Sequence, residues 1–399
     1  MTVVVVGIGA DGWGGLAPLS RAAVEAAEVL LGSDRQLDLV PASVTAHRQA
    51  WPSPMVPALP GLFETHAGRA VVVLASGDPM LSGVGTTLVR LLGPGQVRVL
   101  PAPSSVSLAC ARLGWAVEET EVVSLVGRPL ELLHPRVQPG RRLLVLGSDG
   151  DTPAAVAALL TARGYGESTV TVLSELGGPA EAVHTGTAAA WTPTADPLVV
   201  TAVECRATRG TAPLPTTPGL PDGAYENDGQ LTKNEVRAVT LSRLAAVPGQ
   251  LLWDVGAGAG SIGIEWMRTH PSCRAVAVES VQERAERIVR NATRLGVPHL
   301  RVVHGRAPEV FGRLAPPDAV FVGGGATTPL LLDACWDALR EGGRMVVNAV
   351  TVQSEAVLAD WHARFGGELV RISVQRGEPV GGFTGWKPAM PVTIWSGTR

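Results

Sequence analysis

Residues 251–260 read LLWDVGAGAG, and this stretch decides the fold of the second half of the chain. Its apolar run contains one acid, Asp254, and glycines follow at positions 256, 258 and 260. Residues 261–269 then carry a helical pattern, so we predict a strand, a glycine loop and a helix. Glycine lacks a Cβ, which lets the loop turn sharply and approach a ligand closely. Free N–H groups collect where the helix begins.

The next apolar segment, residues 274–279 (RAVAVE), also ends in an acid, Glu279. A carboxylate at this point of an α/β fold can accept hydrogen bonds from ribose hydroxyls. We therefore expect a nucleoside-containing cofactor here. The alternative is a plain strand-to-helix turn, in which the glycines only allow tight packing. The residues expected to bind the cofactor are Asp254, Gly256, Ala257, Gly258, Ala259, Gly260 and Glu279.

The composition limits the class of protein and its partners. A length of 399 residues, 46% of them hydrophobic, suffices for two or three domains with sizeable cores. The net charge of −3 argues against a nucleic-acid partner. The four cysteines form no C-x-x-C pair, so we expect neither a metal site nor disulfides, and a cytoplasmic location fits. No leader peptide or membrane-length apolar run is visible, so we expect no membrane partner.

Arginine dominates the basic residues, because only Lys233 and Lys387 among the 33 are lysines. Arginine binds carboxylates through two parallel hydrogen bonds, which would suit a substrate with several carboxylates. The base composition of the genome would give the same bias, since alanine, glycine and proline are also abundant, and we favour that explanation.

Near the start, residues 2–12 (TVVVVGIGADG) combine a buried strand with the spacing G-x-G-x-x-G. In a dinucleotide-binding domain a helix would begin at the last glycine of this motif. Here Gly14 and Gly15 follow, and the next helical run covers residues 18–27. The motif is therefore weak evidence for a nicotinamide cofactor.

Two further strands of the first half end in polar loops. Residues 70–79 (AVVVLASGDP) end in G-D-P, and residues 97–105 (VRVLPAPSS) lead through a Pro-Ser turn into a helix. Ligands of open α/β sheets bind at such carboxyl ends. The two loops and the first glycine loop are therefore candidates for one site.

The order G-x-G, G-D-P and P-x-x-S-S resembles the tetrapyrrole methylase family. The resemblance implies two α/β lobes, about 1–104 and 105–205, and a pocket for S-adenosylmethionine (SAM) between them. The family usually continues its first loop as G-P-G-D, whereas this chain has GIGADGWGG, so the role of Asp11 stays open. The cofactor-binding residues that the resemblance implies are Gly7, Gly9, Gly77, Asp78, Pro101 and Ser105.

The second half resembles the Rossmann-like class I SAM methyltransferases. The resemblance rests on the D-x-G-x-G-x-G spacing and on residues 301–306 (RVVHGR), 318–325 (DAVFVGGG) and 342–348 (GGRMVVN). It implies a doubly wound sheet, with Thr232 and Ala307 as further cofactor contacts.

Other features of the second half have simpler interpretations beside the functional ones. Thr232 is also a predicted helix N-cap with Glu235 as its capping-box partner, and the arginines of residues 282–295 are expected on a solvated helix face. Residues 381–391 are expected to form a loop over the active site, or else an ordinary hairpin. The residues expected to contact the substrate are Gly324, Trp386 and Lys387.

Residues 206–229 separate the two halves and are rich in Pro, Gly and Thr without any periodicity. This composition predicts a linker. We therefore expect an α/β protein with domains at residues 1–205 and 230–399.

The fusion of the two halves resembles the precorrin-6Y C(5,15)-methyltransferase (decarboxylating) family of cobalamin biosynthesis. The resemblance implies methylation of a precorrin-type tetrapyrrole at carbons 5 and 15, with loss of carbon dioxide from the ring C acetate. It also implies one SAM site per domain, and we expect a homo-oligomer. The alternatives are a two-domain methyltransferase with another substrate, a nicotinamide-dependent oxidoreductase and, more distantly, a non-catalytic binding protein.

Overall fold

The computed structural model describes residues 2–192 and 198–399. The chain divides into two compact units, which we call unit 1 (Met1–Leu130 and Pro139–Thr211) and unit 2 (Glu131–Gln138 and Ala212–Arg399). Among the described residues, no helix has the length and apolar character needed to cross a bilayer.

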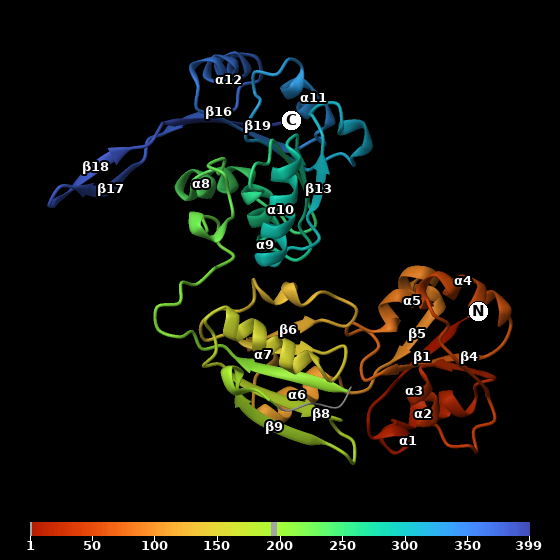
Figure 1. Ribbon diagram of the computed structural model, residues 1–399. Coiled ribbons are helices and arrows are strands. Elements are labelled where there is room, and N and C mark those ends of the chain that lie inside the picture. Colours follow the sequence, from red (N-terminus) through yellow and green to blue (C-terminus); the bar gives the residue numbers. More distant parts are fainter. Residues whose placement is uncertain (1, 193–197) are drawn as a thin grey trace. The chain divides into compact units, whose positions relative to one another are not determined.

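The first sheet of unit 1 is fully parallel, with the strand order β3-β2-β4-β1-β5. Figure 1 labels its neighbouring strands β4, β1 and β5. Its central strands read as continuous apolar runs because both faces are covered by helices, and Val5 and Val6 of β1 are completely buried. The strands are β1 (Val3–Ile8), β2 (Val29–Gly32), β3 (His47–Ala50), β4 (Val71–Ser76) and β5 (Val97–Leu100). The helices that precede β5 are α1 (Gly12–Gly15), α2 (Pro18–Glu25), α3 (Asp34–Asp38), α4 (Met55–Thr65) and α5 (Val84–Leu92).

The second sheet of unit 1 is mixed, with the order β6-β7-β10-β8-β9, and only β6 and β7 pair in parallel. A helix α6 (Ser105–Leu113) leads into it, and α7 (Thr152–Ala162) follows β7. The strands are β6 (Thr120–Ser124), β7 (Arg142–Leu146), β8 (Thr169–Ser174), β9 (Ala182–Thr187) and β10 (Val199–Glu204).

Unit 2 is built on a seven-stranded sheet with the order β13-β12-β11-β14-β15-β19-β16. The first five strands are parallel, and β19 runs antiparallel to both of its neighbours. The order reverses at β11, between β12 and β14, as in doubly wound sheets. The strands are β11 (Leu251–Val255), β12 (Arg274–Glu279), β13 (Arg301–His304), β14 (Ala319–Val322), β15 (Arg344–Ala349), β16 (Glu368–Ile372) and β19 (Val392–Thr398).

Alternate side chains of this sheet enter two separate cores. On one face, Leu252 of β11 packs with helices α8 (Asn234–Leu244), α9 (Ser261–Thr269) and α10 (Gln282–Arg294). On the other face, Trp253 packs with α11 (Leu331–Ala338) and α12 (Val352–Phe365). The strand that precedes the glycine loop is therefore fixed from both sides.

Part of the predicted linker is packed against unit 2. The buried Glu265 of α9 accepts hydrogen bonds from the backbone N–H groups of Gly219 (2.6 Å) and Leu220 (3.1 Å) and from the hydroxyl of Tyr225 (2.8 Å). Arg237 of α8 also donates to Glu265, at 2.5 Å, and is itself fully buried. The segment 219–225 is thus held by buried, charge-assisted hydrogen bonds.

The predicted capping box at Thr232 does not form. Helix α8 begins at Asn234 with Lys233 as its N-cap, and the N–H of Glu235 donates to the side chain of Asn234 at 3.0 Å. The carbonyl of Thr232 instead accepts a hydrogen bond from Arg237. Thr232 is therefore fixed by the buried guanidinium of Arg237 and not by a capping interaction with Glu235.

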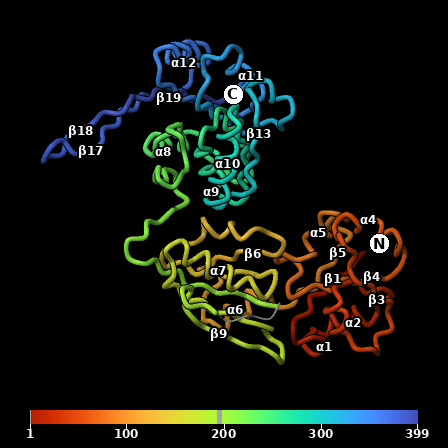
Figure 2. Tube along the Cα trace, viewed as in Figure 1, coloured from red at the N-terminus to blue at the C-terminus, as the bar shows by residue number. Residues whose placement is uncertain are grey.

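A two-stranded hairpin, β17 (Gln375–Val380) and β18 (Phe383–Pro388), is inserted between β16 and β19. It extends away from the seven-stranded sheet, as the blue segment labelled β17 and β18 in Figures 1 and 2 shows. Its side chains include large exposed apolar groups, with Phe383 85% and Trp386 75% exposed. The second interpretation of residues 381–391, a hairpin, is the one that the structure shows.

Candidate functional site

A cavity of about 960 Å³ opens in unit 2 at the carboxyl ends of β11 and β14. This is the place where the strand order reverses, which is where doubly wound sheets bind their ligands. Val255, Gly256 and Gly258 line the cavity from the end of β11, and Gly323 and Gly324 line it from the end of β14.

Gly256, Gly258 and Gly260 have different structural roles, although all three have positive φ. Gly258 lies where a Cβ would be 2.9 Å from the carbonyl oxygen of Gln230, and a Cβ on Gly256 would be 3.3 Å from the backbone of Gly324. A Cβ on Gly260 would instead be 2.7 Å from Ile288 of α10. Gly256 and Gly258 therefore shape the cavity, whereas Gly260 allows close helix packing.

Glu279, at the end of β12, faces the cavity and is only 4% exposed. Its carboxylate accepts the N–H of Gly258 at 2.8 Å and the N–H of Val281 at 3.0 Å. Each carboxylate oxygen can accept two hydrogen bonds, so both keep capacity for a ligand hydroxyl. These two acceptor oxygens therefore fit the hydroxyl donors of the ribose of SAM.

Asp254, expected in the cofactor site, does not line the cavity. Its Oδ2 accepts the N–H of Gly263 at 2.9 Å, inside the first turn of α9, and its side chain is 1% exposed. Burial raises the pKa of this carboxyl to about 7; the charge of Glu279 raises it too, while the bond from Gly263 lowers it. Asp254 fixes α9 to β11, and Ala259 and Gly260 also lie outside the lining.

Three other predicted residues do line the cavity: Thr232, Ala307 and Gly324. Two do not. Trp386 and Lys387 lie on the exposed hairpin, where the Lys387 ammonium pairs with Glu378 at 2.8 Å. Residues 383–388 form a hairpin strand and not a loop folded over the cavity, which is why these two residues lie outside its lining.

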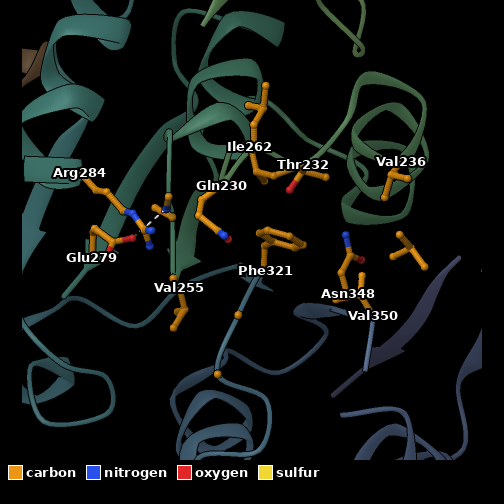
Figure 3. Close-up of a pocket in the computed structure, with 18 of the residues that line it drawn as sticks. Gln230, Thr232, Val236, Val255, Ile262, Glu279, Arg284, Phe321, Asn348 and Val350 are labelled. Atoms are coloured by element: carbon orange, nitrogen blue, oxygen red, sulfur yellow. Dashed lines mark hydrogen bonds between the residues drawn. The ribbon is translucent and has the colours of Figure 1, made fainter. Parts of the chain in front are cut away.

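The cavity has two ends, which Figure 3 shows. Glu279 and Arg284 lie at one end, and Asn348 and Val350 lie at the other, with Phe321 between them. The interpretation of the sequence missed Phe321, Asn348 and Arg284. Phe321 and Asn348 stand in the strands DAVFV and GGRMVVN, and their positions at carboxyl ends were the available signal.

In unit 1, the predicted residues come together where β1, β4 and β5 end. The N–H of Gly77 donates to Ile8 at 3.1 Å, and its carbonyl accepts the N–H of Ala102 at 3.3 Å. A Cβ on Gly7 would be 2.0 Å from the Gly77 oxygen. The close approach of these three loops therefore requires glycine at position 7.

The remaining predicted residues of unit 1 have local contacts. Asp78 accepts the N–H of Met80 at 2.9 Å. Ser105 is the first residue of α6, while Ser104 caps that helix by accepting the N–H of Ser107 at 3.0 Å. Pro101 follows β5 directly.

Gly9 and Gly15 explain the unusual first loop of unit 1. A Cβ on Gly9 would be 2.6 Å from the Asp11 carboxylate, and a Cβ on Gly15 would be 1.8 Å from it. The Asp11 side chain thus lies against the backbone at both glycines. Helix α1 does begin at Gly12, the last glycine of G-x-G-x-x-G, but it ends after four residues.

Comparisons with known proteins cover both units. Residues 2–191 match the family "Tetrapyrrole (Corrin/Porphyrin) Methylases", and residues 223–399 match "Precorrin methyltransferase domain". A Sinorhizobium protein named precorrin-6Y C(5,15)-methyltransferase [decarboxylating] is 49% identical over 100% of this chain and 96% of its own length. A Mycobacterium tuberculosis protein of the same name is 50% identical over 100% of both chains.

The chain belongs to the precorrin-6Y C(5,15)-methyltransferase (decarboxylating) family. The predicted tetrapyrrole methylase and methyltransferase folds are thereby confirmed, as is the assignment to the SAM-dependent C-methyltransferases. A Pyrobaculum calidifontis protein named probable cobalt-precorrin-6B C(15)-methyltransferase (decarboxylating) is 37% identical over 45% of this chain and 94% of its own length.

Proposed function

We propose that this chain methylates a precorrin at carbons 5 and 15 and removes carbon dioxide from its ring C acetate. The observation that carries the proposal is the Glu279 carboxylate, which faces the cavity while it holds the glycine loop through Gly258. Family membership supports the same reaction.

The main contribution of unit 2 to the reaction is to position the methyl donor and the acceptor, and it needs little acid–base catalysis. When bound, SAM supplies an electrophilic methyl group, and in-line transfer depends mainly on alignment of donor and acceptor. Glu279 and the glycine loop orient the cofactor at one end of the cavity. Val350 at the other end and Phe321 between the two ends offer an apolar surface for a macrocycle. Loss of carbon dioxide is favoured by such an apolar surface, since water would stabilise the substrate carboxylate.

We also propose one SAM site in each unit. In unit 2 the contacts are Thr232, Gly256, Ala257, Gly258, Glu279 and Ala307. In unit 1 they are backbone groups of the loops that contain Gly7, Gly9, Gly77, Asp78, Pro101 and Ser105. The adjacent ends of β4, β1 and β5 support the second site.

The expected homo-oligomer, location and domain boundaries remain proposals. The exposed apolar residues of the β17–β18 hairpin, including Phe383 and Trp386, support association with a second copy. The described cysteines are all buried and none lies in a disulfide, which agrees with a cytoplasmic location. The packing of residues 219–225 moves the proposed start of the second domain from 230 to about 219.

The test is incubation of the full chain with precorrin-6Y and SAM, followed by mass spectrometry. We expect a product with two methyl groups gained and one carbon dioxide lost. Titration calorimetry with S-adenosylhomocysteine should give two sites per chain. A product without added methyl groups would refute the reaction, and a single site would refute only the second cofactor pocket.

A further inference from the structure

The cavity of unit 2 has a cofactor end, at Glu279 and Arg284, and an opposite end at Asn348 and Val350, here called the acceptor end. The acceptor end has an apolar wall with a charged pair beside it. The wall is formed by aliphatic residues and one methionine from several elements: Val236, Val350, Ile372, Val374, Met390 and Val392. At its edge, Nη2 of Arg376 on β17 donates to the Glu235 carboxylate on α8 at 2.5 Å. Both side chains line the cavity, and they are 39% and 41% exposed.

We propose that Arg376 binds a carboxylate of the tetrapyrrole substrate, and that Glu235 occupies this place until the substrate arrives. This inference rests on the proposed function. It assigns a substrate-specificity residue to a position that the sequence patterns did not single out.

The guanidinium of Arg376 has N–H donors that its pair with Glu235 does not use, and this supports the assignment. A guanidinium has five N–H donors in a fixed fork, and the hydrogen bonds of Arg376 to described residues use Nη2 alone, toward Glu235 and, at 3.5 Å, toward Asn234. The rest of the fork is available to a second acceptor. A carboxylate can bind such a fork through two parallel bonds, which a lysine cannot provide.

Exposure of the pair makes exchange feasible. A half-exposed ion pair adds little stability because water screens both charges. A substrate carboxylate can therefore replace Glu235 at low cost, while Glu235 returns to water. The apolar wall beside the pair would meanwhile cover the face of the macrocycle, which fixes the register of the carboxylate.

Other cations of the cavity are less suitable. Arg284 lies at the cofactor end and is held by Asp228 at 2.8 Å. Lys233 lies 3.8 Å from Asp222 and offers a point charge only. Arg306 follows β13 and is the chain neighbour of Ala307, one of the proposed SAM contacts, so it too belongs to the cofactor end. Arg376 alone of these four combines a planar fork with a place beside the apolar wall.

The experiment measures the KM for precorrin-6Y and the Kd for SAM in the full chain. Arg376→Gln should raise the KM about 10- to 100-fold, as expected for loss of charge-assisted hydrogen bonds, and leave the Kd for SAM unchanged. Arg376→Lys should give an intermediate KM. Glu235→Gln should leave the KM unchanged or lower it, because it removes the competing carboxylate.

Arg371→Gln is the matched control. Arg371 on β16 makes a similar pair with Glu355, at 2.6 Å, but lies outside the cavity lining, so its KM should stay at the wild-type value. A purely structural pair predicts equal losses in Glu235→Gln and Arg376→Gln, and this result would overturn the inference, as would an unchanged KM in Arg376→Gln. If the wild type itself adds no methyl group to precorrin-6Y, the proposed function fails instead.

Discussion

Glu279 performs two tasks with one carboxylate. It accepts N–H groups from Gly258 and Val281, which fixes the glycine loop, and the same group faces the cavity. Preorganisation of this kind lowers the cost of binding because the acceptor does not need to move. A variant at this position therefore changes both the loop and the contact with the ligand, and the two effects need separate measurements.

Glu279→Gln should weaken binding of S-adenosylhomocysteine to unit 2 by about 10- to 100-fold, since charge-assisted hydrogen bonds to the ribose are lost. Calorimetry on the full chain checks this. A ligand with a 2′-deoxyribose isolates the direct contact, because its affinity should fall much less in the variant. Equal losses for both ligands would show that Glu279 acts only through the loop. Glu286→Gln, on the exposed face of α10, is the control.

Asp254 should make unit 2 less stable as the pH rises. Burial lifts its pKa from 3.8 to about 7, so the folded chain binds this proton more tightly than the unfolded chain does. Below pH 3.8 this carboxyl does not change the free energy of unfolding, because both states hold the proton. As the pH rises from 3.8 to about 7, the free energy of unfolding falls, because only the unfolded chain releases the proton. Asparagine cannot titrate, so the free energy of unfolding of Asp254→Asn does not include this loss. Relative to wild type, it should therefore rise by about 2 kcal/mol when the pH is raised from 5.5 to 8. Denaturant unfolding at both pH values measures it, and a pH-independent difference would contradict it.

For single residues, the sequence patterns indicate which positions lie near the site better than they indicate what each side chain does there. Glu279 and Gly258 do line the cavity, and they could be selected because an acid after a strand and a glycine in a loop have few other uses. Asp254 looked equivalent, yet its side chain points toward α9, and the direction of a side chain at a strand end depends on tertiary packing. Arg376 could not be found, since β17 carries no apolar alternation that would place it.

Among the elements, α10 differs most from its prediction. Its arginines were expected on a solvated face, but they bind the segment of residues 224–230, here called the strap, which continues into the cavity lining at Gln230. Arg290 pairs with Glu226 through two bonds of 2.6 and 3.0 Å, and Arg284 pairs with Asp228. The hydrogen bond from Arg284, together with those from Arg287 and from the N–H of Gln230, lowers the pKa of the Asp228 carboxyl strongly.

Arg290→Gln should loosen the strap and weaken S-adenosylhomocysteine binding to unit 2 about twofold to fivefold, the range for an exposed ion pair. The affinity of the variant should also depend less on salt concentration, because salt screens the ion pair of the wild type and the variant lacks that pair. Calorimetry at low and high salt provides the measurement. The control is Arg364→Gln, which breaks exposed pairs on α12, away from the strap. Equal effects in both variants would contradict a specific role for the strap.

Edge elements were the least predictable part of the fold. Strand β3 (HRQA) and strand β9 (AVHTGT) lie at the edges of their sheets and expose most of their side chains. Without a buried face they carry no apolar run, so the sequence gives no signal for them. The central strands β1, β4 and β11 are buried on both faces and were visible as apolar segments.

At the scale of the whole molecule, two cofactor folds lie on one chain, and each could perform one of the two methylations. We expect unit 2 to methylate carbon 15 and remove the acetate carboxylate, and unit 1 to methylate carbon 5. A protein named probable cobalt-precorrin-6B C(15)-methyltransferase (decarboxylating) matches 45% of this chain, and this is why we expect one unit to carry both of these steps. Decarboxylation beside a methylation in one cavity would avoid release of a reactive intermediate.

Two glycine variants of the full chain separate the activities. Gly258→Val should disable unit 2, because a side chain there would meet the carbonyl of Gln230. The product should then carry one new methyl group, at carbon 5, and keep its carboxylate. Gly7→Ala should disable unit 1, because its Cβ would lie 2.0 Å from the Gly77 oxygen, and the product should gain a methyl at carbon 15 and lose carbon dioxide.

The controls are Gly14→Ala and Gly312→Ala, since a Cβ at either position meets no atom within 4 Å, and both variants should give the doubly methylated product. Mass spectrometry counts the methyl groups and carboxylates, and carbon NMR of labelled product locates them. Decarboxylation by Gly258→Val would refute the division, because carbon dioxide would then leave without a working cavity in unit 2. Loss of both methylations in each variant would mean that the units do not act independently, and that the two reactions share one catalytic assembly.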